Sequence, residues 1–295
     1  MEHNINKPLV SIIMNCYNSS LYLKEALDSV FNQTYNNWEI IFWDNQSTDK
    51  SAIIFKQYVD SRFKYFYAPT HTNLGEARKL AVQNAKGSWI AFLDCDDYWG
   101  LTKLEKQIEI INIKNNIGVI YGGSVVKFEN NSNSPFTWNP DMSSKFPLLS
   151  GNINFELANQ NFIPFLTVLI SRKAYDESKG FSNKYKQAED FEILMKIADL
   201  GYTFEAVHED IAYYRVHADQ NTNSQYDLTF TETIDILKNI NTIKYYSIIK
   251  LFEFNYIIYS IKKYGFVVNT MKLILDYGIL SFLYKSLLKI INKIF

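Results

Sequence analysis

The pattern of apolar and polar positions over the first 111 residues predicts strands and helices in alternation. Short apolar runs, typical of strands buried in a parallel sheet, occur at 9–14, 39–43, 63–68 and 89–93. Apolar residues at helical spacing predict helices over 23–31, over 75–86, where Gly87 would close the helix, and over 104–111. This βαβαβαβ order favours an α/β fold with a doubly wound, mostly parallel sheet flanked by helices.

The second half of the chain is less regular. We interpret residues 119–128 as a strand pair, 129–140 as a loop and 162–171 as an apolar strand. A helix with Glu189 and Asp190 at its start follows these segments. From about residue 235 the pattern is helical, with lysines among Ile, Leu, Phe and Tyr. The sequence therefore predicts a domain of residues 1–234 and a helical C-terminal extension of residues 235–295.

Charge is distributed unevenly along these 295 residues, whose formal net charge is −1. Residues 237–295 contain nine lysines and two acids, a balance of +7, so the remainder carries −8. The overall charge gives no reason to expect nucleic acid as a partner. The basic, aromatic-rich extension has two readings: an interfacial helix on anionic lipid, or a helix that packs on the catalytic domain and leaves its lysines in water.

Three further properties favour a cytoplasmic protein. The only cysteines, Cys16 and Cys95, form no disulfide framework and fit a reducing compartment. Residues 1–7 are polar and lack the apolar core of a signal peptide. No stretch reaches the ~18 apolar residues expected of a membrane-spanning helix. We expect a protein of the cytoplasm, in contact with the inner face of the membrane if the extension binds lipid.

Polar clusters follow three of the predicted strands, at 15–17, 44–49 and 94–97. Because the predicted strands are parallel, the three clusters would lie at one edge of the sheet, where the carboxyl ends of the strands meet. Ligands of open α/β sheets bind at this edge. The last cluster contains Asp94, Asp96 and Asp97, and clustered carboxylates repel one another unless a cation joins them. The run therefore indicates a site for Mg²⁺ or Mn²⁺ and a diphosphate, or alternatively a set of solvated helix caps.

Together these segments resemble glycosyltransferase family 2, whose members are inverting, sugar-nucleotide-dependent enzymes with the Rossmann-like GT-A fold. The resemblance covers roughly residues 8–220. The motifs that carry it are PLVSIIMNCYN at 8–18, QTY at 33–35, WEIIFWDNQSTD at 38–49, NLG at 73–75 and FLDCDD at 92–97.

The resemblance implies roles for residues on the sheet edge. Asn15, Tyr17, Asp44 and Asn45 would hold the base and ribose of the nucleotide. Arg78 corresponds to a basic residue that contacts the nucleotide, although on its own it also reads as a solvated helix residue.

The acidic run corresponds to the metal-binding motif of the family. Asp94 would face the ribose or the metal, and Asp96 would ligate Mg²⁺ or Mn²⁺ at the diphosphate. His217 lies in a segment seen after the catalytic region and would reach the metal, or serve a structural role.

Asp190 corresponds to the base that deprotonates the acceptor hydroxyl, and by its spacing alone it also fits a helix cap. The implied reaction transfers a hexosyl or N-acetylhexosaminyl group from a nucleotide donor, a UDP-sugar, to a glycan or lipid-linked acceptor in bacterial surface polysaccharide biosynthesis. His3, His71 and His208 fit no motif.

Competing classes fit less well. A sugar-phosphate nucleotidyltransferase needs a Gly-rich phosphate loop, and residues 15–18 contain no glycine. A Rossmann oxidoreductase fails because no G-x-G-x-x-G follows the first strand. A sugar-nucleotide-binding module without turnover is the non-enzymatic alternative, which the acidic run and Asp190 disfavour.

Overall fold

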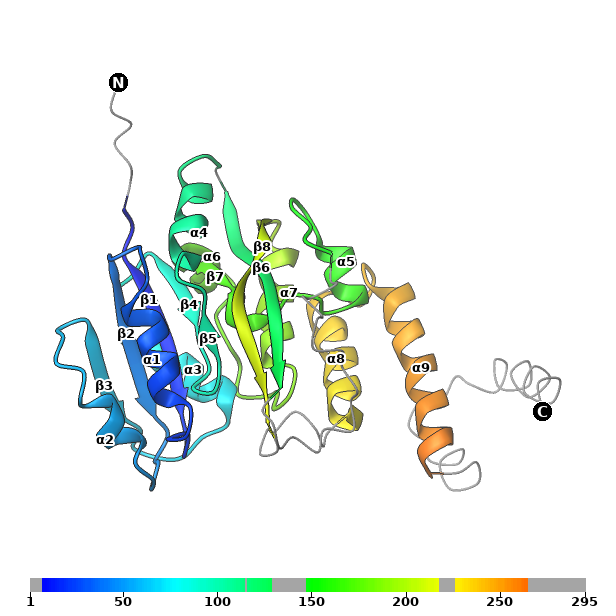
Figure 1. Ribbon diagram of the computed structural model, residues 1–295. Coiled ribbons are helices and arrows are strands. Elements are labelled where there is room, and N and C mark those ends of the chain that lie inside the picture. The colour runs from blue at the N-terminus through cyan, green and yellow to red at the C-terminus, as the bar shows by residue number, and fades with distance from the viewer. Residues whose placement is uncertain (1–6, 115, 129–146, 218–225, 265–295) are drawn as a thin grey trace, which may run out of the picture. The chain divides into compact units, whose positions relative to one another are not determined.

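The computed structural model describes residues 7–114, 116–128, 147–217 and 226–264 (Figure 1). Its strands are β1 (Val10–Cys16), β2 (Trp38–Asp44), β3 (Phe63–Tyr67), β4 (Trp89–Phe92), β5 (Tyr98–Trp99), β6 (Ile117–Phe128), β7 (Leu169–Ser171) and β8 (Thr203–Val216). Its helices are α1 (Leu23–Phe31), α2 (Ser51–Phe55), α3 (Leu74–Val82), α4 (Lys103–Ile111), α5 (Asn154–Asn159), α6 (Arg172–Glu177), α7 (Glu189–Asp199), α8 (Tyr226–Asn241) and α9 (Tyr246–Tyr264), with a 3₁₀ turn, η1 (Phe165–Thr167). The chain divides into two compact units, Met1–Ile236 and Leu237–Phe295.

The strands of the first unit form one sheet in the order β3-β2-β1-β4-β7-β6-β8-β5. Strands β1 to β4 are mutually parallel, β6 and β8 are parallel, and β7 and β5 pair antiparallel to their neighbours. This architecture confirms the predicted α/β class with a mostly parallel sheet. It also places the carboxyl ends of β1, β2 and β4 at the same edge.

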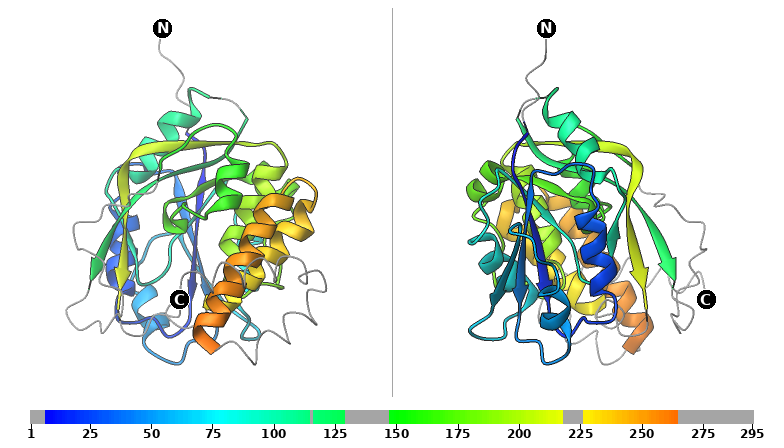
Figure 2. Two further views of the ribbon diagram at one scale, coloured as in Figure 1. Left: turned by 90° about the vertical axis from the view of Figure 1, so that its right-hand side faces the viewer. Right: turned by 60° about the vertical axis from the view of Figure 1, so that its left-hand side comes forward.

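Helices cover both faces of the parallel half of the sheet (Figure 2). Alternate residues of β1, including Val10, Ile12 and Met14, are buried in a core that also contains Leu23 and Leu27 of α1. On the other face α3 packs against β1 and β2. The alternation follows from strand geometry, in which successive side chains point to opposite faces.

Two of the predicted elements have other bounds in the structure. The helix predicted over 75–86 ends at Val82, and Gly87 does not close it. Gly87 instead lies against β1, where a Cβ atom would come within 2.6 Å of the Leu9 carbonyl oxygen. The strand predicted over 162–171 is confined to Leu169–Ser171, because η1 precedes it.

The predicted strand pair at 119–128 is one long strand, β6, which pairs in parallel with β8 along its length (Figure 2). The pairing is irregular at Gly122 and Gly123, where the register shifts. A Cβ at Gly122 would come within 2.7 Å of the Ile211 Cδ1 atom, so the glycine allows β8 to approach. The loop predicted at 129–140 lies outside the described residues.

The helical pattern predicted for the extension is present in α8 and α9. Within the second unit, Lys238 and Lys250 both form ion pairs with Glu253, at 2.8 and 2.7 Å. Among the described residues, no helix combines the length and apolar character needed to cross a membrane.

Candidate active site

Hydrogen bonds join the loop after β1 to the turn after β2. The Asn18 side-chain oxygen accepts from the backbone N–H of Thr48 at 2.8 Å, and Asp49 accepts from that of Ser20 at 2.9 Å. The Ser47 hydroxyl accepts from the backbone N–H of Asn18 at 3.1 Å. The loop that carries Tyr17 is therefore held against the second strand end.

Asp44 is fully buried, and it organises this turn from inside. Its Oδ1 accepts from the backbone N–H of Ser47 at 2.7 Å, and its Oδ2 accepts from the Tyr65 hydroxyl at 2.5 Å. Burial and the neighbouring Asp44 carboxylate raise the pKa of Tyr65, which keeps that hydroxyl a donor. In this structure both oxygens of Asp44 are occupied by the protein itself.

Asn45 and Gln46 tie the turn to the segment after β3. The Asn45 side chain donates to the Thr72 carbonyl oxygen at 2.8 Å and accepts from the Thr72 N–H at 3.1 Å. Gln46 donates to the Pro69 carbonyl oxygen at 3.0 Å. This clamp places His71 against Tyr17, with ring centroids 4.4 Å apart. Asn15 lies beside it on β1, and its buried amide nitrogen has no hydrogen-bond partner in the described chain.

The NLG motif is explained by the start of α3. The Asn73 side chain caps the helix by accepting from the Glu76 N–H at 2.9 Å, and it donates to the Asn183 carbonyl oxygen. A Cβ at Gly75 would approach the Ser182 carbonyl oxygen to 2.9 Å and the Glu189 Cβ atom to 3.4 Å. Cap and glycine together allow α3 to pack closely against the segment that leads into α7.

Arg78, one turn further along α3, joins two acidic clusters. Its Nη2 is 3.0 Å from Asp94 Oδ1, and its Nη1 is 3.0 Å from Glu189 Oε1. The side chain is only 4% exposed, and its guanidinium lies 4.8 Å from the centre of the Phe165 ring. Arg78 is therefore not a solvated helix residue.

Glu189 and Asp190 open α7 beneath this arginine. Burial raises the pKa of Glu189 to about 7, against the attraction of Arg78, which lowers it. Burial also raises the pKa of Asp190, whose Oδ2 lies 3.5 Å from the Asn161 amide. An acid with a raised pKa accepts a proton readily near neutral pH, as a general base requires.

Glu232 on α8 holds the loop before this pair and was missed from the sequence. Its carboxylate accepts from the backbone N–H groups of Lys186, Gln187 and Ala188 at 2.9, 2.9 and 3.0 Å. Asp235, one turn later, accepts from the Tyr185 hydroxyl at 2.8 Å. Acids at this spacing on an amphipathic helix are common, so the pattern alone did not identify a partner 44 to 46 residues away.

The acids of the run at 94–97 contact residues from different elements. Asp96 Oδ2 lies 3.1 Å from His217 Nε2, while Asp97 is buried and accepts from the backbone N–H of Arg215 at 2.8 Å. Arg215 lies in the same segment as His217 but was assigned no role from the sequence; it also donates to the Asp96 carbonyl oxygen. The structure thus brings together the two residues predicted to hold a metal.

The Asp96–His217 pair fits a divalent cation in its spacing and its donor atoms. Two adjacent ligands of an octahedral ion, each about 2.1 Å from it, are about 3.0 Å apart. In the described part of the chain no group of three or more His, Cys, Asp or Glu side chains is arranged to hold a metal. Two protein ligands suit an ion that is also bound by substrate phosphates.

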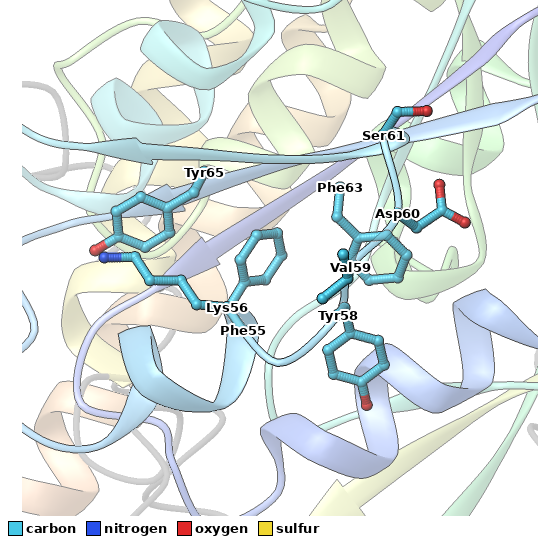
Figure 3. Close-up of a pocket in the computed structure, with 8 residues that line it drawn as sticks. All are labelled: Phe55, Lys56, Tyr58, Val59, Asp60, Ser61, Phe63 and Tyr65. Atoms are coloured by element: carbon cyan, nitrogen blue, oxygen red, sulfur yellow. The ribbon is translucent and has the colours of Figure 1, made fainter.

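A shallow cavity of about 420 Å³ lies elsewhere, beside α2 and β3 (Figure 3). None of the predicted site residues lines it. Its lining residues are Phe55, Lys56, Tyr58, Val59, Asp60, Ser61, Phe63 and Tyr65.

Comparison with known proteins identifies the family. Residues 11–178 match the family described as "Glycosyl transferase family 2", more than half of the chain, and the chain belongs to this family. An uncharacterised glycosyltransferase of Haemophilus influenzae is 40% identical over 120 residues, which are 40% of this chain and 48% of that protein. The chain thus spans about half the length of this relative.

Longer matches support the same class. The Escherichia coli protein WfaP, a UDP-Glc:alpha-D-GlcNAc-diphosphoundecaprenol beta-1,3-glucosyltransferase, is 29% identical over 83% of this chain and 92% of its own. S. aureus TarS 1-349 in complex with UDP-GlcNAc superposes with a TM-score of 0.64 at 21% identity, over 78% of this chain and 65% of that chain. The mannosyltransferase PcManGT of Pyrobaculum calidifontis, solved with GDP-Man and Mn²⁺, gives 0.56 at 13% identity, over 93% and 81%.

The predicted resemblance and the GT-A fold are confirmed, and the chain is a glycosyltransferase. The nucleotidyltransferase, oxidoreductase and non-enzymatic alternatives are set aside. The comparisons do not bear on the individual site residues, whose roles remain predictions.

Substitution of Arg78 tests the link between the acidic clusters. We expect Arg78→Met to destabilise the protein by about 3 kcal/mol, because Glu189 would remain buried without its cation. Without Arg78 the pKa of Glu189 rises above its value of about 7, so the folded state would hold the Glu189 proton to higher pH. The stability lost relative to wild type should therefore be greater at pH 8.5 than at pH 5.

Urea denaturation at both pH values measures this difference. Glu189→Gln in the Arg78→Met background is the matched control and should remove the pH dependence of the loss. An equal loss at both pH values would show that the Arg78–Glu189 pair does not carry the effect.

Proposed function

We propose that this glycosyltransferase transfers a hexosyl or N-acetylhexosaminyl group from a UDP-sugar to a hydroxyl of a glycan or lipid-linked acceptor, with inversion. The observation that carries the proposal is that the buried Arg78 joins the acidic run, which contains Asp96, to the start of α7, which contains Asp190. Asp94 and Glu189, their neighbours in sequence, both bind Arg78. This link supports a role for Asp96 at the metal and for Asp190 as the base of the same site.

The donor would bind along the sheet edge. Tyr17 is 53% exposed there and offers a ring for the base, and Asn15 carries a buried amide nitrogen that lacks a partner in the described chain. Asp44, Asn45 and Arg78 would serve the nucleotide by holding the loops that surround it. The UDP identity is supported by WfaP, named for UDP-Glc, and by the TarS structure with UDP-GlcNAc.

Asp96 and His217 would hold Mn²⁺ or Mg²⁺, with Asp94 beside them. A bound divalent cation offsets the charge that develops on the departing diphosphate. Arg215 supports this site by donating to the Asp96 carbonyl oxygen at 2.8 Å. The PcManGT structure contains Mn²⁺, which favours the same class of cofactor here.

Asp190 would act as the base. Its carboxylate takes the proton of the acceptor hydroxyl as that oxygen forms a bond to the anomeric carbon. The bond from the anomeric carbon to the diphosphate breaks, and its electron pair leaves with the nucleoside diphosphate. One carboxylate suffices because the attack and the departure occur on opposite faces of the sugar.

Surface polysaccharide biosynthesis is the proposed setting, since WfaP is named for a diphosphoundecaprenol-linked acceptor. Contact with the inner face of the membrane is part of this proposal, as is the division into domains 1–234 and 235–295. Ile243, which is 91% exposed, and Leu251 are apolar residues among the lysines of the extension.

Asp190→Asn should lower the transfer rate about 10³-fold and leave UDP binding unchanged, because general bases contribute about 10² to 10⁴. Product formation measures the rate, and calorimetric titration measures binding. Asp176→Asn, an exposed aspartate on α6, is the matched control. Transfer at the wild-type rate in Asp190→Asn would eliminate Asp190 as the base.

Asp96→Asn and His217→Gln should each weaken Mn²⁺ binding at least tenfold, as losing one ligand of a divalent ion removes a large share of its affinity. Calorimetry with Mn²⁺ and UDP measures the affinity, and the same Asp176→Asn variant is the control. Unchanged Mn²⁺ affinity in both variants would contradict the metal site.

The full-length chain should sediment with vesicles of anionic phospholipid more than with neutral vesicles. A chain that ends after Asn241 keeps α8 and loses eight of the nine lysines, so its sedimentation should fall. Equal sedimentation of the two chains with anionic vesicles would indicate that the extension does not bind the membrane.

A further inference from the structure

An exposed aromatic pair stands at the carboxyl edge of the sheet, where the nucleotide is proposed to bind. The Tyr17 and His71 rings are 4.4 Å apart between centroids and inclined at 58°. Tyr17 is 53% exposed, and His71 is also exposed. They come from loops after two different strands, β1 and β3, that the turn after β2 holds together.

The protein fixes the orientation and the tautomer of His71. Its Nδ1 lies 2.8 Å from the backbone carbonyl oxygen of Asn45. A carbonyl oxygen can only accept, so Nδ1 must carry the hydrogen. In the neutral ring Nε2 is then an acceptor, and it has no hydrogen-bond partner in the described part of the chain.

Asp44 and Asn45, two other acceptors expected at this edge, already accept hydrogen bonds from the protein. Asp44 is fully buried and accepts from Ser47 and Tyr65. The Asn45 side-chain oxygen accepts from the Thr72 backbone N–H. Of the three side chains, only His71 combines exposure with an unused acceptor atom.

We propose that His71 is a specificity-determining residue that recognises the nucleobase through Nε2, which accepts the N3–H of uracil beside the Tyr17 ring. The inference rests on the proposed UDP-sugar donor and extends it to the recognition of the base. Uracil N3 is a donor, whereas cytosine N3 is an acceptor and leaves Nε2 unpaired. Asp44, Asn45 and Gln46 then serve as the support that positions His71.

Nucleotides that differ only at the base isolate this contact. We would titrate UDP, CDP and N3-methyl-UDP into the full-length protein with Mn²⁺ in a calorimeter. Wild type should bind UDP about tenfold more tightly than either analogue, the effect of one hydrogen bond. His71→Ala should lose about tenfold in UDP affinity and change little with N3-methyl-UDP, so the preference disappears.

His71→Asn is the second variant: its Nδ2 can replace Nδ1 as donor to the Asn45 carbonyl, and its shorter side chain places no acceptor where Nε2 lies. It should lose the same preference while its melting temperature stays at the wild-type value. His208→Ala, an exposed histidine on β8, is the matched control and should keep both affinity and preference.

The outcomes separate the two hypotheses. If wild-type protein binds CDP as tightly as UDP, the proposed UDP-sugar donor is wrong, and the role of His71 falls with it. A wild-type preference for UDP that persists in both His71 variants would remove His71 alone. If Asp44→Asn loses the preference for UDP while His71→Ala keeps it, Asp44 and not His71 recognises N3–H.

Discussion

The buried guanidinium of Arg78 is the interaction on which the rest of the candidate site depends. A cation at 4% exposure is stable only if nearby charges replace its lost hydration, and here Asp94 and Glu189 do so from elements far apart in sequence. In reverse, Glu189, whose side chain is only 8% exposed, depends on Arg78 for a charge partner. Because Arg78 pairs with Asp94 and Glu189 together, it holds α3, the turn after β4 and the start of α7 in one arrangement.

Several polar residues at the sheet edge act on other loops rather than towards solvent. Asp44 is the clearest case, because a conspicuous acid at a strand end is fully buried and satisfied by Ser47 and Tyr65. Its position in the motif suggests direct contact, but its hydrogen bonds support the turn from which Asn45 clamps residue Thr72. The aromatic pair of Tyr17 and His71, by contrast, is exposed at this edge. Preorganised loops of this kind reduce the entropy that binding must overcome.

Features of the fold and the candidate site that depend on neighbouring residues could be predicted from the sequence, whereas those that depend on distant residues could not. The periodicity of residues 9–111 located the parallel strands and their common edge, because those patterns are local. The parallel pairing of β6 with β8 was not predicted, since it depends on register between segments about 90 residues apart. Arg215 and Glu232 were missed for the same reason. Each is an ordinary charged residue by pattern, and each acquires its role from partners 118 and 44 to 46 residues away.

The three acids of the run after β4 lie in a tight turn rather than on one face of a helix, and their different partners show why. Asp94 binds Arg78 on α3, Asp96 lies against His217 at the end of β8, and Asp97 accepts from the Arg215 backbone. Adjacent residues in a turn point in different directions, so each acid reaches a different element. Only Asp94 and Asp96 keep side chains that are partly exposed, at 41% and 33%. Asp97, whose pKa burial and the neighbouring carboxylates raise, fastens β8 to the turn. The run therefore leaves two carboxylates partly exposed, while the third fixes the turn against β8.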